Sequence, residues 1–92
     1  MMSNTVSKNI TKEYGTTWCA DCRRAKTWLH EHNVPFTDIN IEQDESAIEY
    51  VQKINNGMQK VPTIVFPDGS ILTEPSNKEL EQKVITLDLR TI

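Results

Sequence analysis

Residues 10–22 read ITKEYGTTWCADC and place two cysteines, three positions apart, after a predicted strand and loop. Residues 10–14 predict the strand, although the charged side chains of Lys12 and Glu13 weaken its pattern. Apolar residues then recur at helical spacing and predict a helix over residues 20–32. The cysteine pair is therefore expected at the junction between a loop and the beginning of a helix.

The rest of the chain predicts three more strands and two more helices. These elements are a strand at 36–41, a helix at 45–55 capped by Asp44, a strand at 61–66, a turn at 67–70, a strand beginning at Ile71, and a helix that follows Ser76 and runs through Leu87. Ser76 and Glu79 have the spacing of a capping box. The order βαβαββα requires a sheet that is partly parallel, and the final hairpin is antiparallel. We therefore expect an α/β fold of three layers with a mixed four-stranded sheet.

Length and charge exclude several classes of function. Ninety-two residues make one domain, which we place at residues 9–92 behind a loose tail at residues 1–8. The net charge is −3 and the chain has no basic block, which argues against nucleic acid as a partner. The sequence has no apolar run of membrane-spanning length, and its first residues lack the apolar segment of a signal peptide. We expect a cytoplasmic monomer that does not bind membranes.

The two cysteines, Cys19 and Cys22, are the candidate catalytic residues. A bridge between them would close a very short loop and do little to stabilise a fold, so the pair is better explained by redox chemistry. Cys19 at a helix N-terminus meets free N–H groups that favour a thiolate, which makes it the expected nucleophile. Cys22, one turn later, is expected to be more buried and to resolve mixed disulfides. Among the neighbouring charges, Asp21 should oppose the thiolate of Cys19, and Arg23 should favour it.

Three alternatives to redox chemistry stay open for the two cysteines. They could be small core residues. They could bind a metal together with His30 and His32, although the spacing to these histidines does not match a zinc finger. They could also share an iron–sulfur cluster between two subunits, because two cysteines alone cannot supply four ligands. We predict no bound metal.

The sequence resembles the glutaredoxin branch of the thioredoxin fold, and it is most similar to mycoredoxins and mycoredoxin-like bacterial glutaredoxins. The resemblance covers residues 10–84 and rests on Trp18-Cys19-Ala20-Asp21-Cys22, Val61-Pro62-Thr63, Asn55-Asn56-Gly57 and the run from Val61 to Ser76. It implies a thioredoxin-like fold, with Cys19 as nucleophile and Cys22 as resolving cysteine. It also implies a cis bond before Pro62 and a Val61 backbone that binds a low-molecular-weight thiol.

The same resemblance predicts the partners and the outer residues of the site. It implies disulfide-containing proteins as substrates, no bound cofactor, and mycothiol or glutathione as reductant. Thr63 belongs to the predicted substrate site, and Trp18 either borders this site or packs beside it. The residues at 73–77 replace the paired glycines and aspartate with which many glutaredoxins bind glutathione. Two alternatives remain: a thioredoxin-like protein reductant fed by a flavoprotein reductase, and a non-catalytic module that binds a metal cluster.

Overall fold

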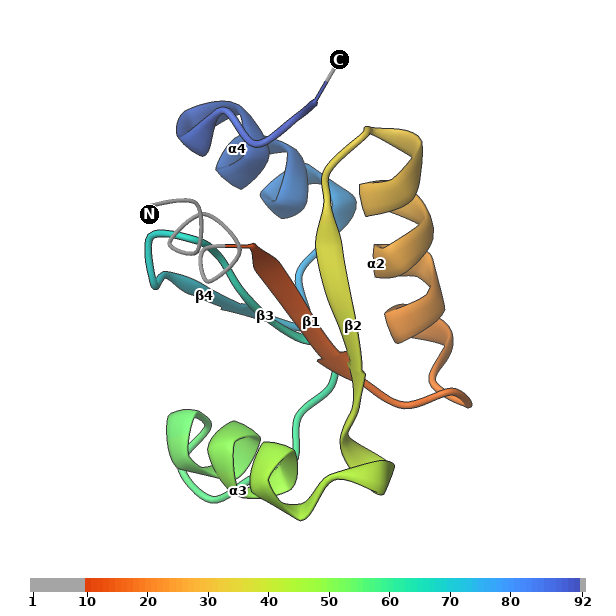
Figure 1. The fold of residues 1–92 in the computed structure, drawn as a ribbon, viewed down its shortest axis with the longest axis vertical. Helices are drawn as coiled ribbons and strands as arrows, with labels where there is room; N and C mark the ends of the chain where they lie inside the picture. The colour runs from red at the N-terminus through yellow and green to blue at the C-terminus, as the bar shows by residue number, and fades with distance from the viewer. Residues whose placement is uncertain (1–9, 92) are drawn as a thin grey trace, which may run out of the picture.

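The computed structural model describes residues 10–91, in which four strands and three α-helices follow one another in the predicted order (Figure 1). The predicted tail at residues 1–8 lies outside the described residues. The elements are β1 (Thr11–Gly15), α2 (Ala20–Glu31), β2 (Phe36–Asn40), a 3₁₀ turn η1 (Ile41–Gln43), α3 (Glu45–Ile54), β3 (Thr63–Val65), β4 (Ile71–Thr73) and α4 (Asn77–Leu87). The expected βαβαββα order is therefore confirmed.

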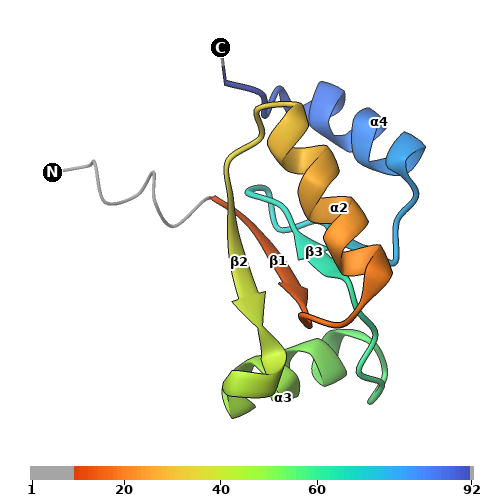
Figure 2. The ribbon, with the colours of Figure 1, turned by 90° about the vertical axis from the view of Figure 1, so that its right-hand side faces the viewer.

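The sheet has the strand order β2-β1-β3-β4 and is mixed, as predicted. β1 pairs with β2 in parallel and with β3 in antiparallel orientation, and β3 pairs with β4 in antiparallel orientation. In Figures 1 and 2, α2 and α4 lie on one face of the sheet and α3 lies on the other. β1 is thus an interior strand with both of its faces covered.

Three apolar clusters hold the three layers together. On the α3 face, Tyr14 packs with Ile41, Ala47 and Val51. On the α2 and α4 face, the buried apolar side chains form two neighbouring groups: Ala25, Ile64, Phe66 and Leu80, and Leu29, Val34 and Val84. Because side chains alternate along a strand, Glu13, which precedes Tyr14, lies on the face that α2 and α4 cover.

The boundaries of three predicted strands were wrong by one or two residues. β1 includes Gly15, which we expected in the loop. β2 ends at Asn40, because the Asn40 side chain accepts a hydrogen bond from the Glu42 N–H and begins the turn η1. Ile41 therefore belongs to that turn and not to β2, and its side chain is buried. β3 is limited to Thr63–Val65, since Pro62 has no N–H to donate to a ladder.

The predicted helix caps are confirmed. The Asp44 carboxylate accepts from the backbone N–H groups at the beginning of α3. Ser76 and Glu79 form a complete capping box at the beginning of α4. After α3, Asn56 and Gly57 adopt positive φ angles of 56° and 89°, which turns the chain away from the helix.

Candidate active site

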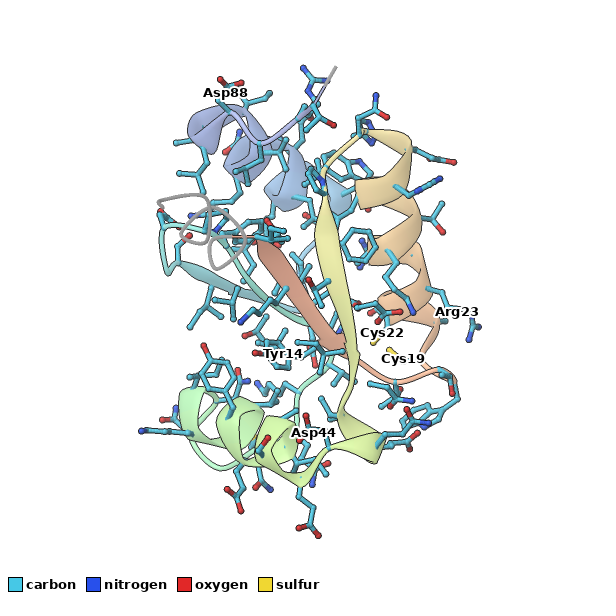
Figure 3. All side chains as sticks on the ribbon, viewed as in Figure 1. Tyr14, Cys19, Cys22, Arg23, Asp44 and Asp88 are labelled. Atoms are coloured by element: carbon cyan, nitrogen blue, oxygen red, sulfur yellow. The ribbon has the colours of Figure 1, made fainter. Side chains whose placement is uncertain are left out.

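Cys19 is the N-cap residue of α2, and its sulfur lies at the positive end of the helix. Its Sγ accepts a hydrogen bond from the backbone N–H of Cys22 at 3.2 Å. The side chain is half-buried, and both cysteines are free thiols. Because the side chain is only half-buried, solvent and substrate can reach the sulfur, and the role of Cys19 as nucleophile stays a prediction. Figure 3 shows the two sulfur atoms close together at the end of β1.

Cys22 lies on the inner side of α2 and has no exposed surface. Burial is the largest cause that raises the pKa of its thiol to about 12, and hydrogen bonding with the Cys19 thiol adds to the rise. The backbone N–H of Thr16 opposes this rise, and the nearby carboxyl of Glu13 increases it. The two cysteines are therefore unequal, as predicted: one is accessible, and the other is protonated and enclosed.

Asp21 and Arg23, the two predicted modulators of Cys19, are both exposed and each has a partner of its own. The Asp21 carboxylate lies 3.8 Å from Nε of Arg24. The Arg23 guanidinium donates to the carbonyl of Thr17 at 2.9 Å, and Figure 3 shows it on the outer side of the helix. Their effect on the Cys19 thiolate stays a prediction.

Pro62 lies at the same end of the sheet as the cysteines. The antiparallel register pairs Tyr14 with Thr63, so the next residue of β1, Gly15, lies beside Pro62. A Cβ atom on Gly15 would in turn be 2.8 Å from Sγ of Cys22. The Val61–Pro62 peptide bond is cis, as the resemblance implied. Two segments about 40 residues apart in the sequence thus meet at one site.

A network centred on Asn55 holds the segment that contains Pro62. The Asn55 side-chain amide donates to the Val51 carbonyl at 2.8 Å and to the Thr63 hydroxyl at 3.2 Å. Thr63 donates to the Lys60 carbonyl at 2.7 Å, and Thr73 donates to the Asn55 side-chain oxygen at 2.9 Å. Every hydrogen-bonding group in this set has a partner, which fixes the orientation of the amide. The end of α3 is thereby joined to β3 and β4.

Trp18 lies exposed beside the loop that carries Cys19, and its role in substrate binding stays a prediction. Its side chain is 66% exposed, so it does not pack in the core. Its Nε1 donates to the carboxylate of Glu42 at 2.8 Å, which holds the indole ring beside the loop that carries Cys19. The ring therefore offers an exposed aromatic surface next to the reactive sulfur.

The histidines that the metal hypothesis required do not join the cysteines. His32 follows the last residue of α2, where its ring stacks on Trp28 with centroids 3.9 Å apart and its Nδ1 lies 2.8 Å from the Trp28 carbonyl oxygen. His30 is exposed in the last turn. Among residues 10–91, no group of three or more His, Cys, Asp or Glu side chains is placed to hold a metal ion.

One charged residue near the cysteines was not predicted as part of the site. Glu13 has no exposed surface, and neither of its carboxyl oxygens has a hydrogen-bond partner. Burial raises the pKa of this carboxyl from 4.5 to about 7, against an opposing effect from Lys26. The sequence of β1 carries no signal for this burial, because Thr11, Lys12 and Glu13 are all polar and show no alternation with apolar residues.

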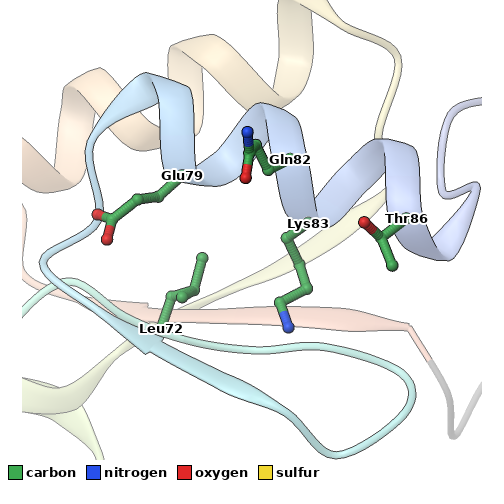
Figure 4. A pocket seen from close by; sticks show the side chains of 5 residues that line it. All are labelled: Leu72, Glu79, Gln82, Lys83 and Thr86. Atoms are coloured by element: carbon green, nitrogen blue, oxygen red, sulfur yellow. The ribbon is translucent and has the colours of Figure 1, made fainter.

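One surface hollow lies away from the cysteines. It has a volume of about 270 Å³ and lies between β4 and α4, where it is lined by Leu72, Glu79, Gln82, Lys83 and Thr86 (Figure 4). None of these residues belongs to the loop, the helix or the proline segment described above. Around the half-buried Cys19, the neighbouring side chains of Thr17, Trp18 and Asp21 are exposed, and we call this region the exposed edge around Cys19.

The family model for glutaredoxin matches residues 10–71, which include both cysteines and Pro62. The chain belongs to the glutaredoxin family. A protein of Mycobacterium tuberculosis named as a glutaredoxin is 39% identical over 74 residues, which cover 80% of this chain and 88% of that protein. Mycoredoxin 1 of Corynebacterium glutamicum is 35% identical over 74 residues, covering 80% and 91% of the two chains.

A solved structure of a glutaredoxin has the same fold as this chain. The buckwheat glutaredoxin–glutathione complex superposes with a TM-score of 0.63 at 19% identity, covering 94% of this chain and 77% of that one. The predicted thioredoxin-like fold is thus confirmed. As a member of the glutaredoxin family with a Cys19–Cys22 pair at its active loop, the chain is a thiol–disulfide oxidoreductase.

Proposed function

We propose that this glutaredoxin reduces mixed disulfides between proteins and a low-molecular-weight thiol, and that Cys19 alone carries out the exchange. The observation that carries the proposal is the inequality of the two thiols. Cys19 caps α2 and is accessible, whereas Cys22 is fully buried with a pKa raised to about 12 by burial. An exchange that needs a single accessible thiolate suits this arrangement.

The proposed reaction has two exchange steps. The Cys19 thiolate attacks the sulfur of the small thiol in the mixed disulfide, and the protein leaves as a thiolate that takes up a proton from solvent. Cys19 is then itself in a mixed disulfide with the small thiol. A second small-thiol molecule attacks that bond, releases the oxidised small-molecule disulfide and returns Cys19 to the thiolate.

The exposed edge around Cys19 is the proposed binding surface. Trp18 would contact the apolar part of the substrate, because its ring is exposed and held in place by Glu42. Val61, which is half-buried, would offer its backbone groups to the small thiol, as the resemblance implies. Pro62 and Thr63 are buried and would act by keeping this backbone in position.

We further propose mycothiol or glutathione as the small thiol. Similarity to a mycoredoxin supports mycothiol, and the buckwheat family member supports glutathione, since it was solved in complex with that thiol. The segment after β4 carries Glu74 and Pro75 where many glutaredoxins have paired glycines, which favours mycothiol. We expect the protein to act as a monomer in the cytoplasm, where thiols stay reduced. Within residues 10–91, no helix is long and apolar enough to cross a membrane.

The test compares Cys22→Ser with wild type on two kinds of substrate. On a mixed disulfide between a protein and mycothiol or glutathione, Cys22→Ser should keep a substantial part of its activity. On an intramolecular protein disulfide it should lose activity and accumulate a covalent complex, because no second thiol expels the product. Cys19→Ser is the matched control and should be inactive on both substrates.

Two results would contradict the proposal. If Cys19→Ser reduced the substrates at the wild-type rate, Cys19 would not be the nucleophile. If Cys22→Ser were inert on every mixed disulfide while wild type accepted electrons from a thioredoxin reductase, the protein would instead be a thioredoxin-like reductant. A visible absorbance band in the purified protein would favour the cluster-binding alternative.

A further inference from the structure

Glu13 lies in the middle of β1, on the face that α2 and α4 cover. Its neighbours in the sheet are Ile64 on β3 and Asp38 on β2. Ile64 is fully buried in the apolar cluster between the sheet and the helices. The Glu13 carboxyl therefore lies in an environment of low polarity, without exposed surface and without a hydrogen-bond partner.

Such a position is costly for a carboxyl group. A buried polar group without a partner destabilises the folded state, and an apolar side chain of similar size would fill the same space at lower cost. The described residues include no arginine, lysine or backbone donor that pairs with this carboxyl. Stability therefore does not explain why a carboxyl occupies this buried position, whereas a role in the chemistry nearby does.

The nearest reactive group is the thiol of Cys22. A Cβ atom on Gly15 would lie 2.8 Å from Sγ of Cys22 and 3.3 Å from Oε2 of Glu13. The sulfur and the carboxyl oxygen therefore lie on either side of one small gap, and their separation cannot exceed these two distances combined. The two groups form no hydrogen bond, so a proton would pass between them through one bridging water molecule. Glycine at position 15 leaves this gap open.

A route to solvent begins on the other side of Glu13. Asp38, its neighbour on β2, is exposed and forms an ion pair with Lys26 of α2 at 3.1 Å. Both charges act on the Glu13 carboxyl: Lys26 favours its ionised form, and Asp38 opposes it. The carboxyl thus lies between the enclosed thiol and a charged pair at the surface. Cys22, Lys26 and Asp38 are the titratable groups that face Glu13 from α2 and β2.

We propose that Glu13 accepts the proton of the Cys22 thiol when Cys22 resolves a mixed disulfide, and returns it when the Cys19–Cys22 disulfide is reduced. The proposal rests on the oxidoreductase function proposed above. It concerns the reaction with intramolecular protein disulfides, in which Cys22 expels the product, and it adds a proton-transfer partner for the buried cysteine. Cys22 needs one, because the enclosed thiol has no solvent contact through which to lose its proton. Burial brings the pKa of the Glu13 carboxyl to about 7, which allows it to take up and release a proton near neutral pH.

Atoms and electrons balance in the resolving step. With Cys19 in a disulfide to a substrate sulfur, the Glu13 carboxylate takes the proton from the Cys22 thiol. The Cys22 thiolate attacks Sγ of Cys19, the Cys19–Cys22 bond forms, and the bond from Cys19 to the substrate sulfur breaks. The substrate leaves as a thiolate, which is the reduced product, and the two cysteines are together oxidised by two electrons. The proton on Glu13 then passes to solvent or to the leaving thiolate.

The test separates the two steps in a rapid-mixing experiment with one equivalent of dithionitrobenzoate, an aromatic disulfide whose thiol product absorbs visible light. Attack by Cys19 releases the first equivalent of coloured thiol, and attack by Cys22 releases the second. In wild type the second-phase rate should rise with pH to a plateau, with a midpoint near the Glu13 pKa of about 7. Glu13→Gln should slow the second phase about 10²-fold near neutral pH and remove that midpoint, while the first phase stays unchanged.

Two further variants separate proton transfer from a merely structural role. Glu13→Asp keeps a carboxyl in the same place and should restore a pH midpoint in the second phase. Asp38→Asn removes a neighbouring charge that raises the Glu13 pKa, so it should move the second-phase midpoint to lower pH while the first phase stays unchanged. Cys22→Ser is the control for assignment, because it should show the first phase only.

The outcomes distinguish this inference from the proposed function. If Glu13→Gln has the wild-type rate and midpoint in the second phase, the role of Glu13 is overturned. If Glu13→Gln does not fold, the pH dependence of the second-phase rate in wild type decides. A rate that keeps rising beyond about pH 9 without a plateau would exclude Glu13 as the proton acceptor. If wild type shows no first phase, the proposed function itself fails.

Discussion

Replacing Glu13 by Gln should make the protein more stable at neutral pH. It should also remove the part of the pH dependence of stability that comes from the ionisation of Glu13. Burial raises the pKa of this carboxyl from 4.5 to about 7 in the folded protein. Well below pH 4.5 the group is protonated in both states, so its ionisation does not affect stability. As the pH rises, the unfolded chain ionises first, so the folded state loses stability until the folded carboxyl also ionises near pH 7.

The size of the effect follows from the same two values. A rise from 4.5 to about 7 corresponds to a loss of about 3 kcal/mol in unfolding free energy, because each pKa unit is worth about 1.4 kcal/mol. Glutamine has the shape of the protonated acid and does not ionise. The difference in stability between Glu13→Gln and wild type should therefore move by about 3 kcal/mol in favour of the variant between about pH 4 and about pH 8.

The assay is urea denaturation of wild type and variant under reducing conditions, followed by circular dichroism across this pH range. Glu42→Gln is the matched control, because it removes an exposed carboxylate, and it should follow the wild-type pH dependence. A constant difference between Glu13→Gln and wild type at every pH would refute the reasoning, since it would mean that Glu13 ionises equally easily in both states.

Three further predictions concern the cysteine pair and the last helix. In the native protein at about pH 8, an alkylating reagent should modify Cys19 well before Cys22, since burial raises the Cys22 pKa to about 12; peptide mass spectrometry measures both, and equal rates would contradict the assignment. Gly15→Ala should lower the unfolding free energy by about 1–3 kcal/mol, because the new Cβ would lie 2.8 Å from Sγ of Cys22, and Cys22→Ala should relieve part of this cost. Ser76→Ala should cost about 1 kcal/mol in the same denaturation assay through loss of the capping box, and an unchanged midpoint would show that the cap is dispensable.

Local signals allowed most of the elements to be predicted from the sequence. Ser76 and Glu79 identify the beginning of α4 because a capping box involves only residues three apart. The limits of β2 were less certain, because the strand ends where the Asn40 side chain turns back to the Glu42 N–H instead of continuing an apolar pattern. Cys19 and Cys22 could be assigned unequal positions from their spacing at a helix N-terminus.

The parts of the site that were not predicted depend on residues far apart in the sequence. The exposure of Trp18 depends on Glu42, which lies 24 residues later. Glu13 looked like a surface residue that weakened a strand, because a charged side chain in a short strand usually points to solvent. Its burial follows from the interior position of β1 and from coverage by α2, which no pattern within residues 10–14 encodes.

The Asn55 network has a consequence for protein engineering. The residues between α3 and β3 would be the natural segment to exchange with another glutaredoxin in order to change the preferred thiol. Residues outside that segment hold it in place. The Asn55 amide donates to the Thr63 hydroxyl and accepts from Thr73 in β4, and the Thr63 hydroxyl donates to the Lys60 carbonyl. A graft of residues 58–62 alone would leave these anchors matched to the original backbone, so an exchange of specificity has to carry Asn55, Thr63 and Thr73 with it as one unit.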